Sequence, residues 1–133
     1  MAATATKARA RSRQKLAVAR QRAQVAKNEL RDLRHRYSLS QALLARLLDV
    51  SLRTLSGAES AAATAPPRLR RSATQVARLC GALAEAMQPA FVGQWLDQPN
   101  EMLGNLKPVE AIERGLIDVV WQVAEGLRFG SQL

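Results

Sequence analysis

The sequence has few of the side chains that usually carry catalysis or bind metals, since its 133 residues include one cysteine and one histidine. Cys80 has no second thiol for an intramolecular disulfide, which fits a reducing compartment such as the cytoplasm. It falls among Val76, Leu79 and Leu83 at helical spacing. We therefore interpret Cys80 as a small core residue rather than a reactive thiol.

Catalytic motifs are missing as well. His35 lies in a basic stretch with no cysteine, aspartate or glutamate at a spacing typical of a metal site or a catalytic triad. No glycine-rich phosphate-binding loop occurs. We predict that the chain is not an enzyme and that it binds neither a metal nor a cofactor.

Long apolar runs and alternating strand patterns are also absent. No stretch is long and apolar enough for a transmembrane helix, so we expect a cytoplasmic protein without a membrane partner. Aromatic residues make up only 4% of the chain, and alanine and leucine dominate its apolar fraction of 47%. Because no period-two alternation persists, we predict an all-α fold.

Charge is distributed unevenly along the chain. Residues 1–36 carry 11 basic and 2 acidic side chains, residues 37–80 carry 6 and 2, and residues 81–133 carry 3 and 7. The corresponding net charges are +9, +4 and −4. A basic front half suits a polyanion such as nucleic acid, whereas the acidic end should face a different partner.

The first predicted segment is a basic N-terminal arm, residues 1–36. Residues 1–12 have no apolar stripe and are expected to be disordered alone, whereas a helix is expected over roughly residues 14–36. Residues 1–28 contain no acid, a composition shared with mitochondrial transit peptides. However, the arginines continue through Arg34 and Arg36 into the predicted folded part, which disfavours that reading.

The second predicted segment, residues 37–67, contains two short helices and a linker. Ser40 is a good N-cap for a helix over residues 41–48, and Ser51 can cap a second helix that begins at Leu52. A tight turn at residues 49–51 joins them, which is the spacing of a helix-turn-helix. Its expected core residues are Leu43, Leu44, Leu47, Val50 and Leu55.

This stretch resembles the Xre-type, lambda-repressor-like helix-turn-helix. The resemblance is carried by Leu39-Ser40-Gln41, Leu44-Ala45-Arg46-Leu47-Leu48, Val50-Ser51, Thr54-Leu55 and Glu59. Asp49 departs from the family's usual glycine, and Gly57-Ala58 replaces larger residues. The resemblance implies a phosphate contact from Gln41 and a recognition helix that begins at Ser51. The candidate DNA-binding residues are Gln41, Ser51, Leu52, Arg53, Ser56, Arg68, Arg70 and Arg71.

The third predicted segment, residues 68–133, begins with a connecting helix. Ser72 and Gln75 form a capping-box pattern, which predicts a helix over residues 73–87, and Pro89 starts another that ends at Leu96. After a turn at Pro99-Asn100, Pro108 suits the first position of a short helix that Gly115 ends or tilts. Apolar steps of three and four then continue to Leu127. The residues expected to form the apolar faces are Phe91, Val92, Trp95, Leu96, Val109, Ile112, Leu116, Ile117, Val119, Val120, Val123 and Leu127, with Gly126 and Gly130 closing the last helix.

The order Trp95-Leu96, Pro99-Asn100, Leu103-Gly104, Pro108, Gly115, an apolar helix and Gly130 resembles the C-terminal toxin-binding domain of the MbcA/ParS/Xre antitoxins. The two resemblances together span about residues 37–130. They imply a type II antitoxin that neutralises a cognate toxin, commonly a RES-domain toxin that attacks NAD, and represses its own operon. The implied toxin-binding residues are Glu125, Arg128, Phe129, Gln132 and Leu133.

Two other functions stay open at this point. The helix-turn-helix alone would support a stand-alone transcription regulator that has no toxin partner. The arginine-rich residues 7–36 would also suit an RNA-associated protein, although RNA recognition usually uses exposed aromatics and only Tyr37 is near. In the antitoxin reading, the partners are a cognate toxin, operator DNA and a second copy of the chain, since helix-turn-helix proteins read paired half-sites.

Overall fold

The computed structural model describes the backbone of residues 2–60 and 65–130, and the side chains of residues 6–18, 29–60 and 65–130. Within these ranges the chain is all-α, as the sequence predicted, with no strand and one isolated bridge between Asn100 and Leu106. No described helix is long and apolar enough to cross a membrane. The elements are α1 (Ala2–Tyr37), α2 (Gln41–Leu48), α3 (Leu52–Ser60), α4 (Pro67–Leu83), η1 (Pro89–Phe91), α5 (Val92–Leu96), η2 (Glu101–Leu103), α6 (Pro108–Glu113) and α7 (Ile117–Phe129).

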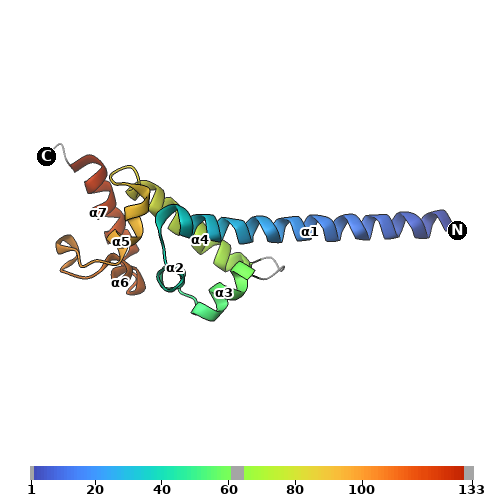
Figure 1. Ribbon diagram of the computed structural model, residues 1–133, viewed down its shortest axis with the longest axis horizontal. Helices are drawn as coiled ribbons and strands as arrows, with labels where there is room; N and C mark the ends of the chain where they lie inside the picture. The colour runs from blue at the N-terminus through green and yellow to red at the C-terminus, as the bar shows by residue number, and fades with distance from the viewer. Residues whose placement is uncertain (1, 61–64, 131–133) are drawn as a thin grey trace.

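The first helix, α1, is longer than the sequence predicted. It begins at Ala2 rather than near residue 14, so the expectation that residues 1–12 are disordered is wrong for the described residues 2–12. Alanine, arginine, lysine and glutamine have high helix propensity, and this composition continues the helix toward its N-terminus. Among the described side chains of α1, those of its last part pack against the other helices, whereas its N-terminal part extends away from them (Figure 1).

Helix α4 also begins earlier than predicted. Its first residue is Pro67, and Ser72 lies inside the helix instead of capping it. The predicted capping box is therefore wrong, because proline at the first helical position starts the helix without a side-chain cap. The helix ends at Leu83, four residues before the predicted end at Met87.

One hydrophobic core connects all parts of the body. Helix α4 packs against α1, α2 and α7, while α2 also contacts α3 and α6. The core includes Leu33 from α1, Leu44 from α2, Leu79 from α4 and Val120 from α7. Consequently the helix-turn-helix and the C-terminal helices are packed side by side on α4.

Helix α5 crosses very close to the end of α1. A Cβ atom added at Gly93 would lie 2.4 Å from the carbonyl oxygen of Ser38 and 2.9 Å from that of Tyr37. Ser38 itself has a left-handed backbone with φ of 53°, and the Leu39 N–H donates to the Arg34 carbonyl at 2.8 Å. These contacts direct the chain from α1 into α2, and they require a residue without a side chain at position 93.

The turns before and after α6 lie where the prolines and glycines of the sequence predicted them. The Asn100 side chain accepts a hydrogen bond from the Met102 N–H at 2.9 Å, and Gly104 and Gly115 have left-handed φ values of 64° and 81°. Pro108 begins α6, as predicted, and Gly130 caps α7. Gly126 lies within α7, so the prediction that it closes this helix is wrong.

Candidate DNA-binding and partner-binding surfaces

The helix-turn-helix forms from local capping interactions. The Leu43 N–H donates to the Ser40 hydroxyl at 3.0 Å, and the Thr54 N–H donates to the Ser51 hydroxyl at 3.0 Å. Both serines thus begin the helices that the sequence assigned to them. Between the helices, Asp49 has the left-handed backbone (φ 56°, ψ 48°) that favours glycine.

A buried ion pair holds α3 against α1 and α2. The Arg34 guanidinium donates from Nε to Oε1 of Glu59 at 2.6 Å and from Nη2 to Oε2 at 3.2 Å. Gln41 Nε2 donates to Oε2 of the same carboxylate at 2.7 Å. The Glu59 side chain is 5% exposed, so this cluster fixes the position of α3 through a carboxylate removed from water.

The predicted DNA-binding residues are all at least partly accessible. On α3, Leu52 is 51% exposed, and Arg53 and Ser56 are exposed with it. Arg68, Arg70 and Arg71 are exposed in the first turns of α4. Gln41 is half-buried and donates one of its two amide N–H groups to Glu59.

The expected core of this motif is largely present. Leu43, Leu44, Leu47 and Leu55 are buried, and the half-buried Val50 packs against them. Cys80 is fully buried, as predicted, and burial raises the pKa of its thiol to about 12. Among the described residues, no group of three or more His, Cys, Asp or Glu side chains could hold a metal ion.

The predicted toxin-binding residues lie at the end of α7. Glu125, Arg128 and Phe129 are exposed, with Phe129 58% exposed. The Arg128 guanidinium lies 5.0 Å from the centre of the Phe129 ring, and its Nε forms an ion pair with Glu85 beyond the end of α4. Gln132 and Leu133 lie outside the described residues. The described part of the predicted site therefore presents an aromatic ring and a cation together at one end of the molecule.

The face of α7 that the sequence predicted to be apolar is only partly buried. Leu116, directly before the helix, and Val119 and Leu127 within it are 42%, 37% and 42% exposed. Val120, Val123 and Ala124 are buried, and Val123 lies between Val119 and Leu127 along the same side of the helix. The predicted apolar face therefore packs into the core at Val120 and remains exposed at Leu127.

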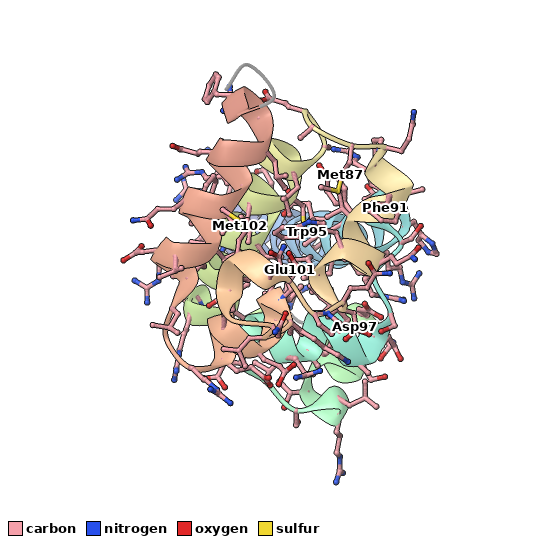
Figure 2. The ribbon with its side chains drawn as sticks, turned by 90° about the vertical axis from the view of Figure 1, so that its left-hand side faces the viewer. Met87, Phe91, Trp95, Asp97, Glu101 and Met102 are labelled. Atoms are coloured by element: carbon pink, nitrogen blue, oxygen red, sulfur yellow. The ribbon has the colours of Figure 1, made fainter. Side chains whose placement is uncertain are left out.

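Met102 is a further exposed apolar side chain on the neighbouring segment. It is 75% exposed on η2, which contacts α7. Figure 2 shows Met102 next to α7, with Trp95 between it and the more distant Phe91. We call Met102, Leu116, Val119 and Leu127 the α7 patch. Phe91 was expected on an apolar helix face but is 38% exposed, and Trp95 is half-buried against the core.

No protein-family model matches the chain, and no curated protein matches it. Among solved structures, it is similar to a chain in the crystal structure of the M. tuberculosis MbcT-MbcA toxin-antitoxin complex. The TM-score is 0.62 at 19% sequence identity, and the similarity covers 78% of this chain and 94% of that chain. The all-α fold matches that of the MbcA antitoxin chain, which confirms the fold that the sequence resemblance implied.

Proposed function

We propose that this chain is the antitoxin of a type II toxin-antitoxin pair, with the end of α7 and the α7 patch as its toxin-binding surface. The observation that carries the proposal is the fold similarity to the MbcA antitoxin chain over most of both chains. Exposed apolar side chains in the C-terminal part of the chain agree with it, because exposed apolar surface often marks a protein interface. The proposed toxin is a RES-domain protein that attacks NAD.

The charge of the C-terminal part supports a protein partner with a basic binding cleft. Residues 81–133 have a net charge of −4, opposite in sign to the rest of the chain. Phe129 would contribute an apolar anchor, since large aromatic side chains often dominate binding energy at interfaces. Its position at the end of α7 would let the following residues reach the toxin's active site and block entry of substrate.

Operator binding by the helix-turn-helix is the second part of the proposal. The exposed residues of α3 would face the major groove, and Arg53 is the side chain there that can make a bidentate contact with guanine. Arg68, Arg70 and Arg71 would contact phosphates. A homodimer would place two recognition helices on paired half-sites.

Co-expression with the product of the adjacent toxin gene tests the toxin-binding surface. Removal of residues 126–133 should abolish both rescue of growth and co-purification of the toxin, while operator binding survives. The substitution Phe129→Ser should weaken binding by roughly ten-fold or more, as expected for an interface anchor. The matched control is Phe91→Ser, which changes an exposed phenylalanine away from α7 (Figure 2).

A separate variant tests whether the α7 patch contributes to toxin binding. Val119→Ser combined with Leu127→Ser should weaken toxin binding while the protein stays folded, because both side chains are more than one-third exposed and lose less buried area than core residues would. Thermal unfolding measures the loss of stability separately. If the double variant and the truncated chain both protect cells as well as the wild type, the toxin-binding surface is elsewhere. A toxin that binds neither form nor the wild type would favour the stand-alone regulator.

DNA binding is tested by comparing specific and random duplexes. Arg53→Ala should weaken binding to the operator by about ten-fold or more, which corresponds to one bidentate base contact, and should weaken binding to random DNA less. Equal losses on both duplexes would mean that Arg53 contacts only phosphate.

A further inference from the structure

The N-terminal part of α1 carries charge that neither the core nor the predicted toxin surface uses. We call residues 6–18 the basic arm. It contains Lys7, Arg9, Arg11, Arg13 and Lys15, has no acidic residue, and is exposed along its whole length. The salt bridges among the described side chains all lie elsewhere, in the body of the protein. The basic arm therefore offers its cations to a partner.

Helical geometry places these cations in two opposite rows. At roughly 100° per residue, Lys7, Arg11 and Lys15 lie within about 80° of one another. Arg9 and Arg13 lie on the other side, each about 160° from Arg11, the middle residue of the first row. Uncharged side chains occupy the two faces between the rows, with Ala8 and Ser12 on one face and Ala10, Gln14 and Ala17 on the other. A helix that lies on a membrane would instead gather its cations on one face, opposite an apolar one.

The charges also destabilise the helix that carries them. Like charges four residues apart occur at Lys7–Arg11, Arg11–Lys15 and Arg9–Arg13, and each such pair destabilises a helix by about 0.2–0.5 kcal/mol. The arm has no buried side chain whose packing could offset this repulsion. A polyanion with negative charge on both sides of the helix would remove this repulsion between the cations.

We infer that the basic arm lies in the major groove of B-form DNA and contacts the phosphates of both groove walls with its two rows. An α-helix with side chains is about 10–12 Å wide, and the groove is about 12 Å wide. Alanines on both faces between the rows allow a close approach, and Ser12 or Gln14 adds at most one polar side chain toward the base edges. Most of the contact is therefore with phosphates, which are the same in every sequence. The deep, narrow major groove of double-stranded RNA excludes such a helix.

The arm would contact DNA well away from the helix-turn-helix. Lys7 precedes Leu30, the first buried residue among the described side chains of α1, by 23 positions, which is about 35 Å along a helix, or roughly ten base pairs. Figure 1 shows this part of α1 extending past α3 and away from the body. The inference extends the proposed DNA binding, but it does not require the helix-turn-helix to read an operator.

The salt dependence of binding measures the phosphate contacts of the arm. The full-length chain and a variant with Lys7, Arg9, Arg11, Arg13 and Lys15 all changed to Gln are titrated with a random-sequence 30-base-pair duplex at several KCl concentrations. Five lost contacts should make the slope of log K against log[KCl] less steep by about 4.5. Between 50 and 200 mM KCl, wild-type affinity should thus fall about 500-fold more than that of the variant.

Two further variants control for charge and for folding. Changing Arg9, Arg11 and Arg13 to Lys keeps the charge and should leave the slope unchanged. Changing the five cations to Ala, the strongest helix former, should reproduce the slope of the Gln variant if charge is the cause. Thermal unfolding should be the same for all variants, since the arm contributes no buried side chain.

Several outcomes would overturn the inference. An unchanged slope in the Gln and Ala variants would exclude phosphate contacts by the arm. Equal binding of wild-type protein to double-stranded RNA of the same sequence would exclude the major groove. Unchanged DNA binding with lost toxin neutralisation would make the arm a protein contact. The Arg53→Ala variant separates the two proposals: if it loses no preference for the operator while the Gln variant shows the smaller slope, base reading by Arg53 fails and the arm contact stands.

Discussion

Arg46 of α2 and Glu113 of α6, which are 67 positions apart, form a two-point ion pair with Nε–Oε2 and Nη2–Oε1 distances of 3.1 and 2.6 Å. The pair links the helix-turn-helix directly to the C-terminal helices. Its side chains are 39% and 40% exposed, so solvent screens the attraction. The link therefore contributes more to the relative orientation of the two parts than to the free energy of unfolding.

Replacing Glu113 with Gln should lower stability slightly, and only above acidic pH. The hydrogen bond from Arg46 lowers the pKa of Glu113 below its ordinary value of 4.5, and the same bond raises the pKa of Arg46. A carboxyl whose folded pKa is lowered adds stability above 4.5, which is lost as pH falls through the folded pKa. We expect a loss of about 0.5 kcal/mol at pH 7 and less at pH 3 in urea unfolding. Glu125→Gln is the exposed control, and an equal effect in both variants would contradict the prediction.

Replacing Glu59 with Gln should be far more damaging. This carboxylate is 5% exposed and accepts hydrogen bonds from Arg34 and Gln41, so neutralising it leaves a partly buried guanidinium without its counter-charge. We expect the free energy of unfolding to fall by about 3 kcal/mol, against about 1 kcal/mol for Gln41→Ala. Urea unfolding at pH 7 measures both. A loss no larger than that of Glu113→Gln would show that burial does not decide the effect.

Replacing two helical glycines with alanine should change the stability of the protein in opposite directions. At Gly93, the new Cβ would collide with backbone atoms of Tyr37 and Ser38, so Gly93→Ala should destabilise the protein by about 3 kcal/mol. At Gly126, inside α7, a Cβ meets nothing within 4 Å, and Gly126→Ala should raise stability by about 0.5–1 kcal/mol. Melting temperatures of the two variants provide the comparison. Shifts in the same direction would disprove the close approach of α5 to α1.

Asp49→Gly should stabilise the protein. The residue has a left-handed backbone at the end of α2, where a side chain is disfavoured and glycine is not. We expect a gain of about 0.5–1 kcal/mol. The strain energy that is lost when the side chain is removed from the left-handed backbone exceeds the entropic cost of a more flexible glycine in the unfolded chain. Ala42→Gly, at an exposed position inside α2, should instead lose about 1 kcal/mol. Urea unfolding measures the free energy of unfolding of both variants. If both are less stable than the wild type, the backbone at Asp49 is not strained.

The helix-turn-helix could be predicted because its signals are local. Ser40 and Ser51 accept hydrogen bonds from N–H groups three residues ahead, so their positions in the sequence mark the helix starts. The start of α4 could not be predicted in this way, since Pro67 and Ser72 both carry valid start signals. In the structure, the Arg70 N–H donates to the Pro66 carbonyl at 3.1 Å and Leu69 packs into the core, so the turn before Ser72 belongs to the helix.

At the candidate partner surface, the sequence pattern of α7 could not predict which apolar residues are buried. A step of three or four residues predicts a helix, but it does not tell which apolar residues the body covers. Val120 is buried against the core, whereas Val119 and Leu127 remain exposed in the α7 patch. Similarly, Glu59 was recognised as part of a motif, but its contacts with Arg34 and Gln41 depend on α1 and α2 meeting α3.

The sequence by itself determined the all-α class, the two capped helices of the helix-turn-helix, and the change of charge sign along the chain. These properties depend on local hydrogen bonds, propensities and composition, which act over a few residues. The tertiary structure decided which apolar residues are covered, how Glu59 is paired, and that the two parts share one core through α4. Burial and pairing join residues distant in sequence, so they are defined only once the helices have packed together.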